Sequence, residues 1–482
     1  AEVSLASGAR IRPATIVAEG GVVINDRRDP NAELLTATAD RMVSELIEND
    51  RTRRTAVLTG KPDAPARIEQ GSNKLIGREI RLDQSDGSAA VDGAGTLDFV
   101  TKKDASGNDL PEPRAVKVQW AKAMSFSGKK RTAEFTGDVA MDSALDDVRC
   151  QELQLVFTEQ LGEPNSPAVA VAASPAGAPV GPSSMAAAAK ADKPAGRARA
   201  SRLGGMAVSM EQYSRRRISM IFAEKDIVLR SRREDERNRL VRRMQLAGEK
   251  LIYDAEGKRI TMLGRGTLMA EDYDKPRPQK VADADGTIAA VDRPSQSAFA
   301  WNKSMVLSQK DRVVTLEGGV IMDHRSGDQI MGKDKLNVPQ DQWGTLPAGR
   351  KTRLECDIMM ARFGEPVSTP ATQPSTRPAR RSGGDPLREG PTMGPLDLFE
   401  ATGDVSLKDG PRHVLAQRLI YNRDNDLAVV WGFLDGKPLA KASITYEDPQ
   451  TGRTQTVASP KFIWYRRDNR VFSEDVSASG GR

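Results

Sequence analysis

Histidine and cysteine are almost absent from this 482-residue chain, and their scarcity excludes several kinds of site. There are 2 histidines, His324 and His413, and 2 cysteines, Cys150 and Cys356. The usual zinc sites and nucleophile triads need more of these side chains than the chain offers. No spacing of Asp and Glu distinguishes an acid and base pair. We therefore predict no metal, no cofactor and no enzymatic activity.

The histidines and cysteines are too few to indicate a catalytic or metal site, and we consider only structural roles for them. Cys150 and Cys356 do not amount to a disulfide framework, so one bridge and two free thiols both stay open. His324 and His413 each follow a strand-like segment, and we interpret them as surface residues of polar turns.

Long apolar runs are also missing. No stretch approaches the ~18 uninterrupted apolar residues that a membrane helix needs. The longest run, 168–180, is interrupted by Pro175 and Pro179. The sequence begins at Ala1 without a methionine or a signal-peptide pattern. We expect a processed chain or a piece of a longer one, with any export signal or anchor upstream.

The chain has no strong excess of one charge. Its 72 Lys and Arg residues are nearly balanced by 66 Asp and Glu residues, which leaves a net charge of +6. So weak a field over this length does not indicate a nucleic-acid partner. Arginine clusters such as 230–233 allow two interpretations, which are contact with lipid phosphates and an ordinary solvated surface.

Two segments of unusual composition divide the chain. Residues 162–205 are rich in Ala, Pro and Gly, and residues 364–395 are rich in Pro, Thr, Ser and Arg. Such segments cannot bury enough apolar surface to offset the entropy of ordering, so we predict disordered linkers. They would separate three modules, at 1–161, 206–363 and 396–482, of which the first is expected to be truncated at its start.

The modules share internal repeats. Residues 120–142 read WAKAMSFSGKKRTAEFTGDVAMD, and residues 301–323 read WNKSMVLSQKDRVVTLEGGVIMD. They align without a gap. A second shared motif, Gly-x-Gly-Thr-Leu, occurs at 93–97 and 264–268. Apolar residues alternate at period two between polar turns, which is typical of strands, and glycine recurs where a strand bends. The pattern predicts an elongated all-β stack of repeats that share one core.

Part of the first module resembles a known family. The segments are TAVLTG at 55–60, ARIEQGSNKLIG at 66–77, EIRLD at 79–83 and the Val-x-Gly at 91–93. Together they resemble the OstA-like domain of the lipopolysaccharide-transport proteins LptA and LptC and of the amino-terminal part of LptD. The resemblance implies an open β-jellyroll whose two strand rows form a hydrophobic groove.

The resemblance also implies a function and partners. It predicts a non-enzymatic conduit or bridge in the periplasm of a Gram-negative-type envelope, associated with the inner or outer membrane. The groove would shield the acyl chains of lipopolysaccharide or a similar acylated amphiphile during transport to the outer membrane. Other jellyroll transport proteins would join by edge-strand addition, and a membrane anchor or barrel outside this chain stays open. The alternative is a structural β-repeat scaffold that links envelope components without carrying lipid.

The candidate groove residues are apolar residues at alternating positions of the repeats. A competing interpretation is that they simply fill the core, and an error of one residue in register would turn any of them outward. The candidates are Trp120, Met124, Phe135, Val139, Trp301, Met305, Leu316, Val320, Val405 and Ile420.

Overall fold

The computed structural model of the chain describes its strands and the short turns between them. The two predicted linkers lie outside the described residues, apart from Gly364. The described ranges are 2–5, 13–27, 33–47, 53–83, 85–103, 109–143, 146–158, 217–234, 240–273, 294–331, 349, 351–364, 396–422, 425, 427–434, 437–438, 441–447, 451–465, 470–473 and 477–479.

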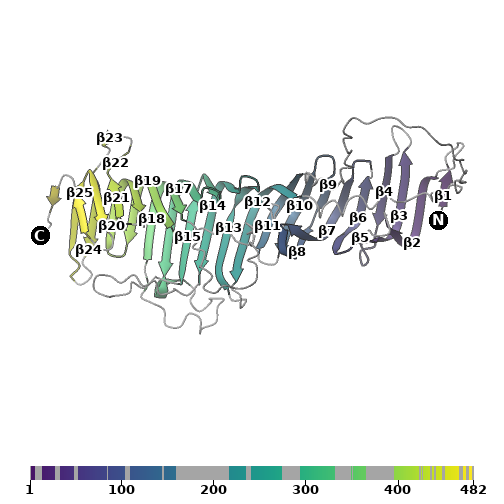
Figure 1. Ribbon diagram of the computed structural model, residues 1–482, viewed down its shortest axis with the longest axis horizontal. Coiled ribbons are helices and arrows are strands. Elements are labelled where there is room, and N and C mark those ends of the chain that lie inside the picture. Colours follow the sequence, from purple (N-terminus) through teal and green to yellow (C-terminus); the bar gives the residue numbers. More distant parts are fainter. Residues whose placement is uncertain are drawn as a thin grey trace, which may run out of the picture.

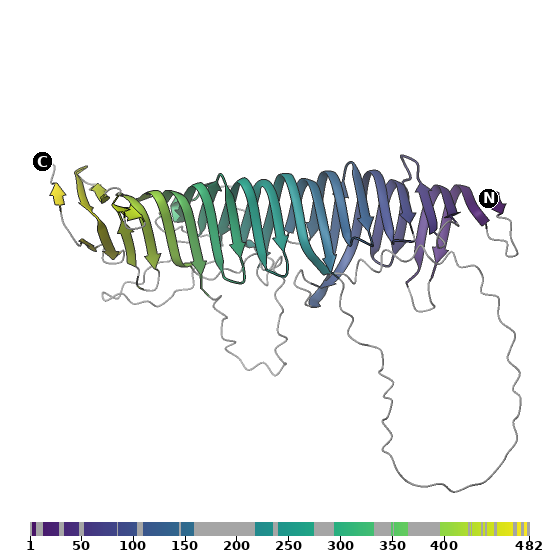
Figure 2. The ribbon, with the colours of Figure 1, turned by 90° about the horizontal axis from the view of Figure 1, so that it is seen from above.

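Most described residues lie in β-strands, which follow one another along an elongated molecule (Figures 1 and 2). Before the first predicted linker these are β1 (Glu2–Leu5), β2 (Pro13–Asp26), β3 (Leu35–Ile47), β4 (Arg53–Thr59), β5 (Ala66–Gln70), β6 (Asn73–Asp83), β7 (Ser88–Lys103), β8 (Asp109–Trp120), β9 (Ala123–Ser127), β10 (Thr132–Ser143) and β11 (Asp146–Thr158). Between the linkers they are β12 (Arg217–Glu234), β13 (Leu240–Asp254), β14 (Arg259–Asp272), β15 (Ser295–Trp301), β16 (Ser304–Ser308), β17 (Val313–Ser326) and β18 (Lys351–Phe363). The last part has β19 (Leu396–Asp409), β20 (Arg412–Asn422), β21 (Leu427–Trp431), β22 (Phe433–Leu434), β23 (Lys437–Pro438), β24 (Ala442–Glu447), β25 (Thr454–Ser459), β26 (Lys461–Tyr465), β27 (Arg470–Ser473) and β28 (Ser477–Ser479).

All these strands except β22 and β23 join one antiparallel sheet, so the predicted elongated all-β fold is confirmed. Within the described ranges, helical structure is limited to the 3₁₀ turn Gly327–Gln329. No helix in that part of the chain is long and apolar enough to cross a membrane.

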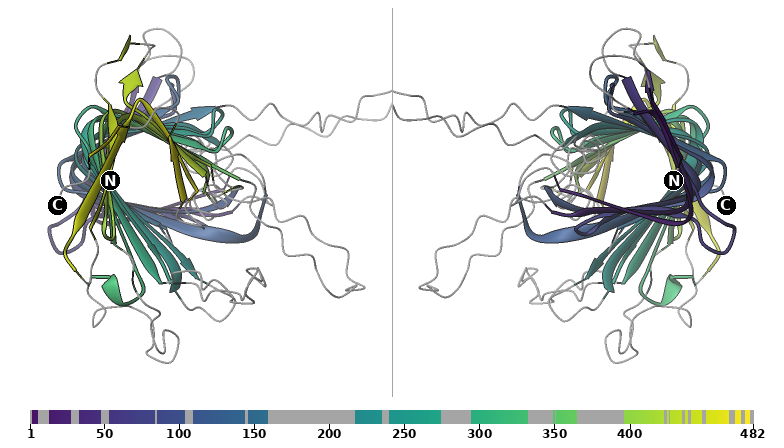
Figure 3. Two further views of the ribbon diagram at one scale, coloured as in Figure 1. Left: turned by 90° about the vertical axis from the view of Figure 1, so that its left-hand side faces the viewer. Right: turned by 90° about the vertical axis from the view of Figure 1, so that its right-hand side faces the viewer.

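The long strands bend, and their two halves belong to different rows. In β10 the first half pairs with β9 and the second half pairs with β8. We call the row that contains β4, β9, β16, β21 and β26 row A, and the row that contains β5, β8, β15, β24 and β25 row B. Seen along the molecular axis, the strands surround a common interior (Figure 3). The bends form one side of this interior, the corner, and hairpin turns lie at the opposite side, which we call the mouth.

Glycine forms the bends, as the sequence predicts. In β17 the register shifts between Glu317 and Val320, so that Gly318 and Gly319 bulge out of the ladder. Their φ angles are +91° and +60°, a conformation that glycine adopts without strain. Corresponding bulges in β2, β10 and β19 contain Gly20, Gly137 and Gly403.

One left-handed bulge lacks glycine, and sequence reasoning missed it for that reason. In β12 the register shifts between Glu224 and Ile227, which leaves Lys225 and Asp226 in the bulge. Their φ angles are +64° and +54°. The left-handed conformation costs a residue with a side chain roughly 1–2 kcal/mol, so this bend is strained.

The Gly-x-Gly-Thr-Leu motif makes room for tryptophan. Its first glycine, Gly264, has a φ of +83° at the corner. Its second, Gly266, lies under the Trp301 ring, where a Cβ would be 2.3 Å from a ring carbon. Gly95 lies under Trp120 in the same way, with a corresponding distance of 2.4 Å. The repeated tryptophans and glycines are therefore packing partners.

The sheet runs without a break across both predicted linkers. Val148 on β11 is the register partner of Leu229 on β12, and Leu354 on β18 is the partner of Leu407 on β19. The three-module division stays a prediction, but the described strands on either side of each division share hydrogen-bonded ladders and one hydrophobic core.

Candidate functional site

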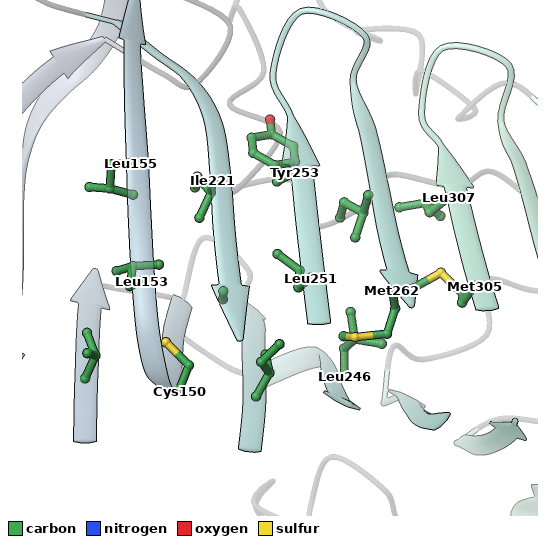
Figure 4. Close-up of a cluster of buried hydrophobic side chains, with 14 of the residues drawn as sticks. Cys150, Leu153, Leu155, Ile221, Leu246, Leu251, Tyr253, Met262, Met305 and Leu307 are labelled. Atoms are coloured by element: carbon green, nitrogen blue, oxygen red, sulfur yellow. The ribbon is translucent and has the colours of Figure 1, made fainter. Parts of the chain in front are cut away.

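Inward side chains of row A form two apolar ladders, in which each residue is the register partner of the next. Figure 4 shows part of both: Leu153, Leu251, Met262 and Met305 in the ladder near the corner, and Leu155, Ile221, Tyr253 and Leu307 in the ladder near the mouth. The corner ladder runs through Ala18, Met42, Leu58, Ile80, Val91, Met124, Phe135, Leu153, Ala223, Leu251, Met262, Met305, Leu316, Met359, Ala401, Leu419, Val430 and Phe462.

The mouth ladder of row A is apolar apart from Ser44 and the tyrosine hydroxyls. It runs through Ile16, Ser44, Ala56, Leu82, Ala89, Phe126, Ala133, Leu155, Ile221, Tyr253, Ile260, Leu307, Val314, Ala361, Phe399, Tyr421, Ala428 and Trp464.

Row B contributes one continuous apolar ladder that faces row A. It runs through Ile24, Ala37, Ile68, Leu75, Leu97, Val118, Met141, Val148, Leu229, Leu246, Leu268, Phe299, Met322, Leu354, Leu407, Val414, Ile444 and Val457. The two rows are in direct contact: the ring centroids of Trp120 from row B and Phe135 from row A are 5.4 Å apart. An apolar track therefore extends along the described length of the molecule.

The structure places nine of the ten candidate residues in the closed part of this interior. Their exposed fractions are 3% or less. Four belong to the corner ladder of row A, namely Met124, Phe135, Met305 and Leu316, and five lie in row B beside the corner, namely Trp120, Val139, Trp301, Val320 and Val405. They pack against one another, and none of them lines an open channel.

Ile420 does not belong to the inward set. Leu419 and Tyr421 are its neighbours on β20 and occupy the two ladders of row A, so Ile420 points away from the interior. The assignment from sequence was one residue out of register, which in a strand moves a side chain to the opposite face.

Half-buried apolar residues lie further from the bends, and sequence reasoning missed them. They are half-buried and pack against the core. The alternation of apolar residues could have identified them, if followed two residues further from each bend. On the strands from β14 onward they include Leu268, Phe299, Met322, Phe363, Phe399, Leu407, Tyr421 and Val457.

A small cavity lies between the rows in the first part of the molecule. Its volume is about 30 Å³, enough for a water-sized molecule and not for an acyl chain. Asn73, Leu97 and Phe99 line it from row B, and Ala133, Phe135, Leu155 and Phe157 line it from row A. Buried side chains of both rows pack around this cavity, so an acyl chain would enter there only if neighbouring residues moved aside.

The outer faces carry polar side chains in ion pairs. Arg353 contacts Asp323 at 3.0 Å, and Lys250 contacts Glu224 at 2.6 Å. The Arg230–Arg233 cluster follows this pattern, because Arg230 lies 3.5 Å from Asp147. That contact favours the solvated-surface interpretation of the cluster.

Both cysteines are buried free thiols at equivalent bends. Cys150 is the register partner of Val139, and Cys356 is the partner of Val320. Burial raises the pKa of each thiol to about 12, so both are neutral near pH 7. The bridge that the sequence left open is not formed.

Both histidines lie within strands and not in turns, which corrects the sequence-based interpretation. His324 of β17 contacts the hydroxyl of Ser297 through Nδ1 at 2.9 Å. His413 of β20 contacts the hydroxyl of Ser406 through Nε2 at 3.0 Å, and burial lowers the pKa of His413. In the described part of the chain, His, Cys, Asp and Glu form no cluster that could hold a metal ion.

No protein-family model matches the chain, and no curated protein matches it in sequence. The resemblance to the OstA-like domain therefore stays a prediction.

Proposed function

We propose that this protein is a non-enzymatic conduit or bridge that shields the acyl chains of an amphiphile between its two strand rows. The observation that carries the proposal is the continuity of the apolar ladders, which extend from Ile16 and Ile24 to Trp464 and Val457. An acyl chain placed along these ladders gains ~0.8 kcal/mol for each methylene removed from water.

The resemblance to lipopolysaccharide-transport proteins supports the choice of cargo and compartment. We propose a lipopolysaccharide-like lipid as the amphiphile and the periplasm as the location. Free thiols at Cys150 and Cys356 are compatible with that compartment because both are buried and neutral.

We extend the proposal to partners that join through strand edges. Within the described residues, the second half of β2, from Val22 to Asp26, pairs only with β3. A half-strand with one free edge can accept a strand from another protein.

A structural scaffold without lipid is the second candidate. The filled interior favours it, because the described cavity is too small for an acyl chain. The two functions differ in whether the half-buried residues at the mouth ever contact lipid.

A photoreactive amino acid at Phe399 distinguishes the two functions. Phe399 is half-buried in the mouth ladder of row A. The matched control is Ile358 on the neighbouring strand, which is 43% exposed on the outer face. In cells that make lipopolysaccharide, illumination should attach an acylated lipid at position 399 and not at position 358. No adduct at position 399, or equal adducts at both, would contradict lipid shielding and favour the scaffold.

A further inference from the structure

The two edges of the mouth differ in polarity. On row A the inward residues nearest the turns are apolar from Ile260 to Ala428, apart from the hydroxyl of Tyr421. On row B the corresponding residues from β15 to β24 form a polar ladder, which we call rim B. Rim B consists of Ser297, His324, Thr352, Asp409, Arg412 and Tyr446.

Rim B faces the interior and not the outer surface. Each of its residues lies two positions from a member of the row B apolar ladder, and side chains two apart on a strand share a face. Arg412, for example, lies two residues before Val414, which is 1% exposed. The guanidinium of Arg412 also lies 5.5 Å from the ring of Trp464 on row A, so the two edges approach each other there.

The side chains of rim B are linked to one another. The hydroxyl of Ser297 contacts Nδ1 of His324 at 2.9 Å, and the hydroxyl of Thr352 donates to Asp409 Oδ1 at 3.0 Å. Tyr446, under the guanidinium of Arg412, is 36% exposed. An inward polar ladder is unnecessary for a core that only has to pack. Apart from Asp409, which is buried, the residues of rim B are partly exposed and can contact a ligand at the mouth.

We infer that rim B binds a part of the amphiphile's polar head that is uncharged and rich in hydroxyl groups. The inference rests on the proposed function. Asp409 and Arg412 carry one charge of each sign, so rim B lacks the excess of cations that a phosphate site needs. Its remaining members offer hydroxyl and imidazole groups, which can both donate and accept hydrogen bonds, as sugar hydroxyls can. The acyl chain then lies against row A, and the bound amphiphile has one orientation across the mouth.

Calorimetric titration of the full chain with three amphiphiles tests this orientation. Dodecyl maltoside, dodecyl phosphate and dodecyltrimethylammonium share one chain and differ only in the head, and each is used below its critical micelle concentration. Thr352→Val and Ser297→Ala remove hydroxyls from rim B. Ser406→Ala is the control, because it removes a hydroxyl that contacts His413 on the outer face of neighbouring strands. Circular dichroism checks that each variant is folded.

We expect dodecyl maltoside to bind most tightly. Each rim B variant should weaken its binding about fivefold, the effect of one neutral hydrogen bond, and change dodecyl phosphate binding less than twofold. The control should leave all three unchanged. Tightest binding of dodecyl phosphate, or rim B variants that affect all three ligands equally, would overturn the assignment of the head while leaving acyl-chain binding intact. If no amphiphile binds the unaltered chain, the proposed function fails as well.

Discussion

Truncation of Leu316 to alanine should loosen the interior much more than the same truncation of Leu407. Leu316 is 0% exposed and lies between Met305 and Met359 in the corner ladder, so its loss leaves a cavity enclosed by both rows. Comparable truncations cost about 3 kcal/mol or more. Leu407 is only half-buried, so its truncation removes less buried apolar surface and should cost about 1 kcal/mol.

Amide hydrogen exchange is the suitable assay, because stacked repeats can unfold in parts and a single melting temperature would average over them. The Leu316→Ala change should accelerate exchange in β16, β17 and β18 by about two orders of magnitude. The Leu407→Ala change should accelerate exchange in β18, β19 and β20 by about fivefold. Equal effects of the two changes would refute the distinction between a closed corner and an accessible mouth.

Three further predictions follow from the bends and the packing beside them. Gly266→Ala places a methyl group against the Trp301 ring and should destabilise the protein by about 1–3 kcal/mol in urea unfolding. Gly87→Ala is the comparison: a Cβ there meets no atom within 4 Å, so this variant shows the effect of backbone strain without a clash. Lys225→Gly removes the strain of a left-handed residue but also removes an exposed ion pair with Glu152, so the protein should be equally or more stable. A loss of stability above about 1 kcal/mol would contradict the claim that this bend is strained. The buried Cys150 thiol has a pKa of about 12, above its usual value of 9.0, so only the thiol of the unfolded chain ionises between these pH values. The free energy of unfolding should therefore fall over that pH range by up to ~1.4 kcal/mol per pH unit more than in Cys150→Ala. Identical pH profiles of the two proteins would contradict this burial.

The bends and the tryptophan positions could be predicted from the sequence because their physical causes are local. Gly318 and Gly319 mark a bulge by their composition, and the spacing of repeated motifs placed Trp120 and Trp301 in equivalent positions. The bend at Lys225 could not be predicted in this way, because a left-handed residue other than glycine is not recognisable from composition.

The side facing the interior was harder to predict, because it depends on which strands pair. At Ile420 an error of one residue reversed the assignment. The polar rim was missed for a related reason: His324 reads as a turn residue in sequence, and only its pairing with Thr352 places it on the inner face of a strand. The distinction between filled corner and accessible mouth depends on how the rows fold together, and alternation alone does not reveal it.

Native mass spectrometry of the protein, purified without detergent from a host that makes lipopolysaccharide, tests lipid carriage most directly. We expect a population with a bound acylated species that detergent removes. The same population should be lost in Leu407→Asp, which places a charge at the mouth, and retained in Ser406→Asp, which places one on the outer face of the same strand. A single lipid-free mass, unchanged after incubation with lipopolysaccharide, would contradict the conduit and leave the scaffold.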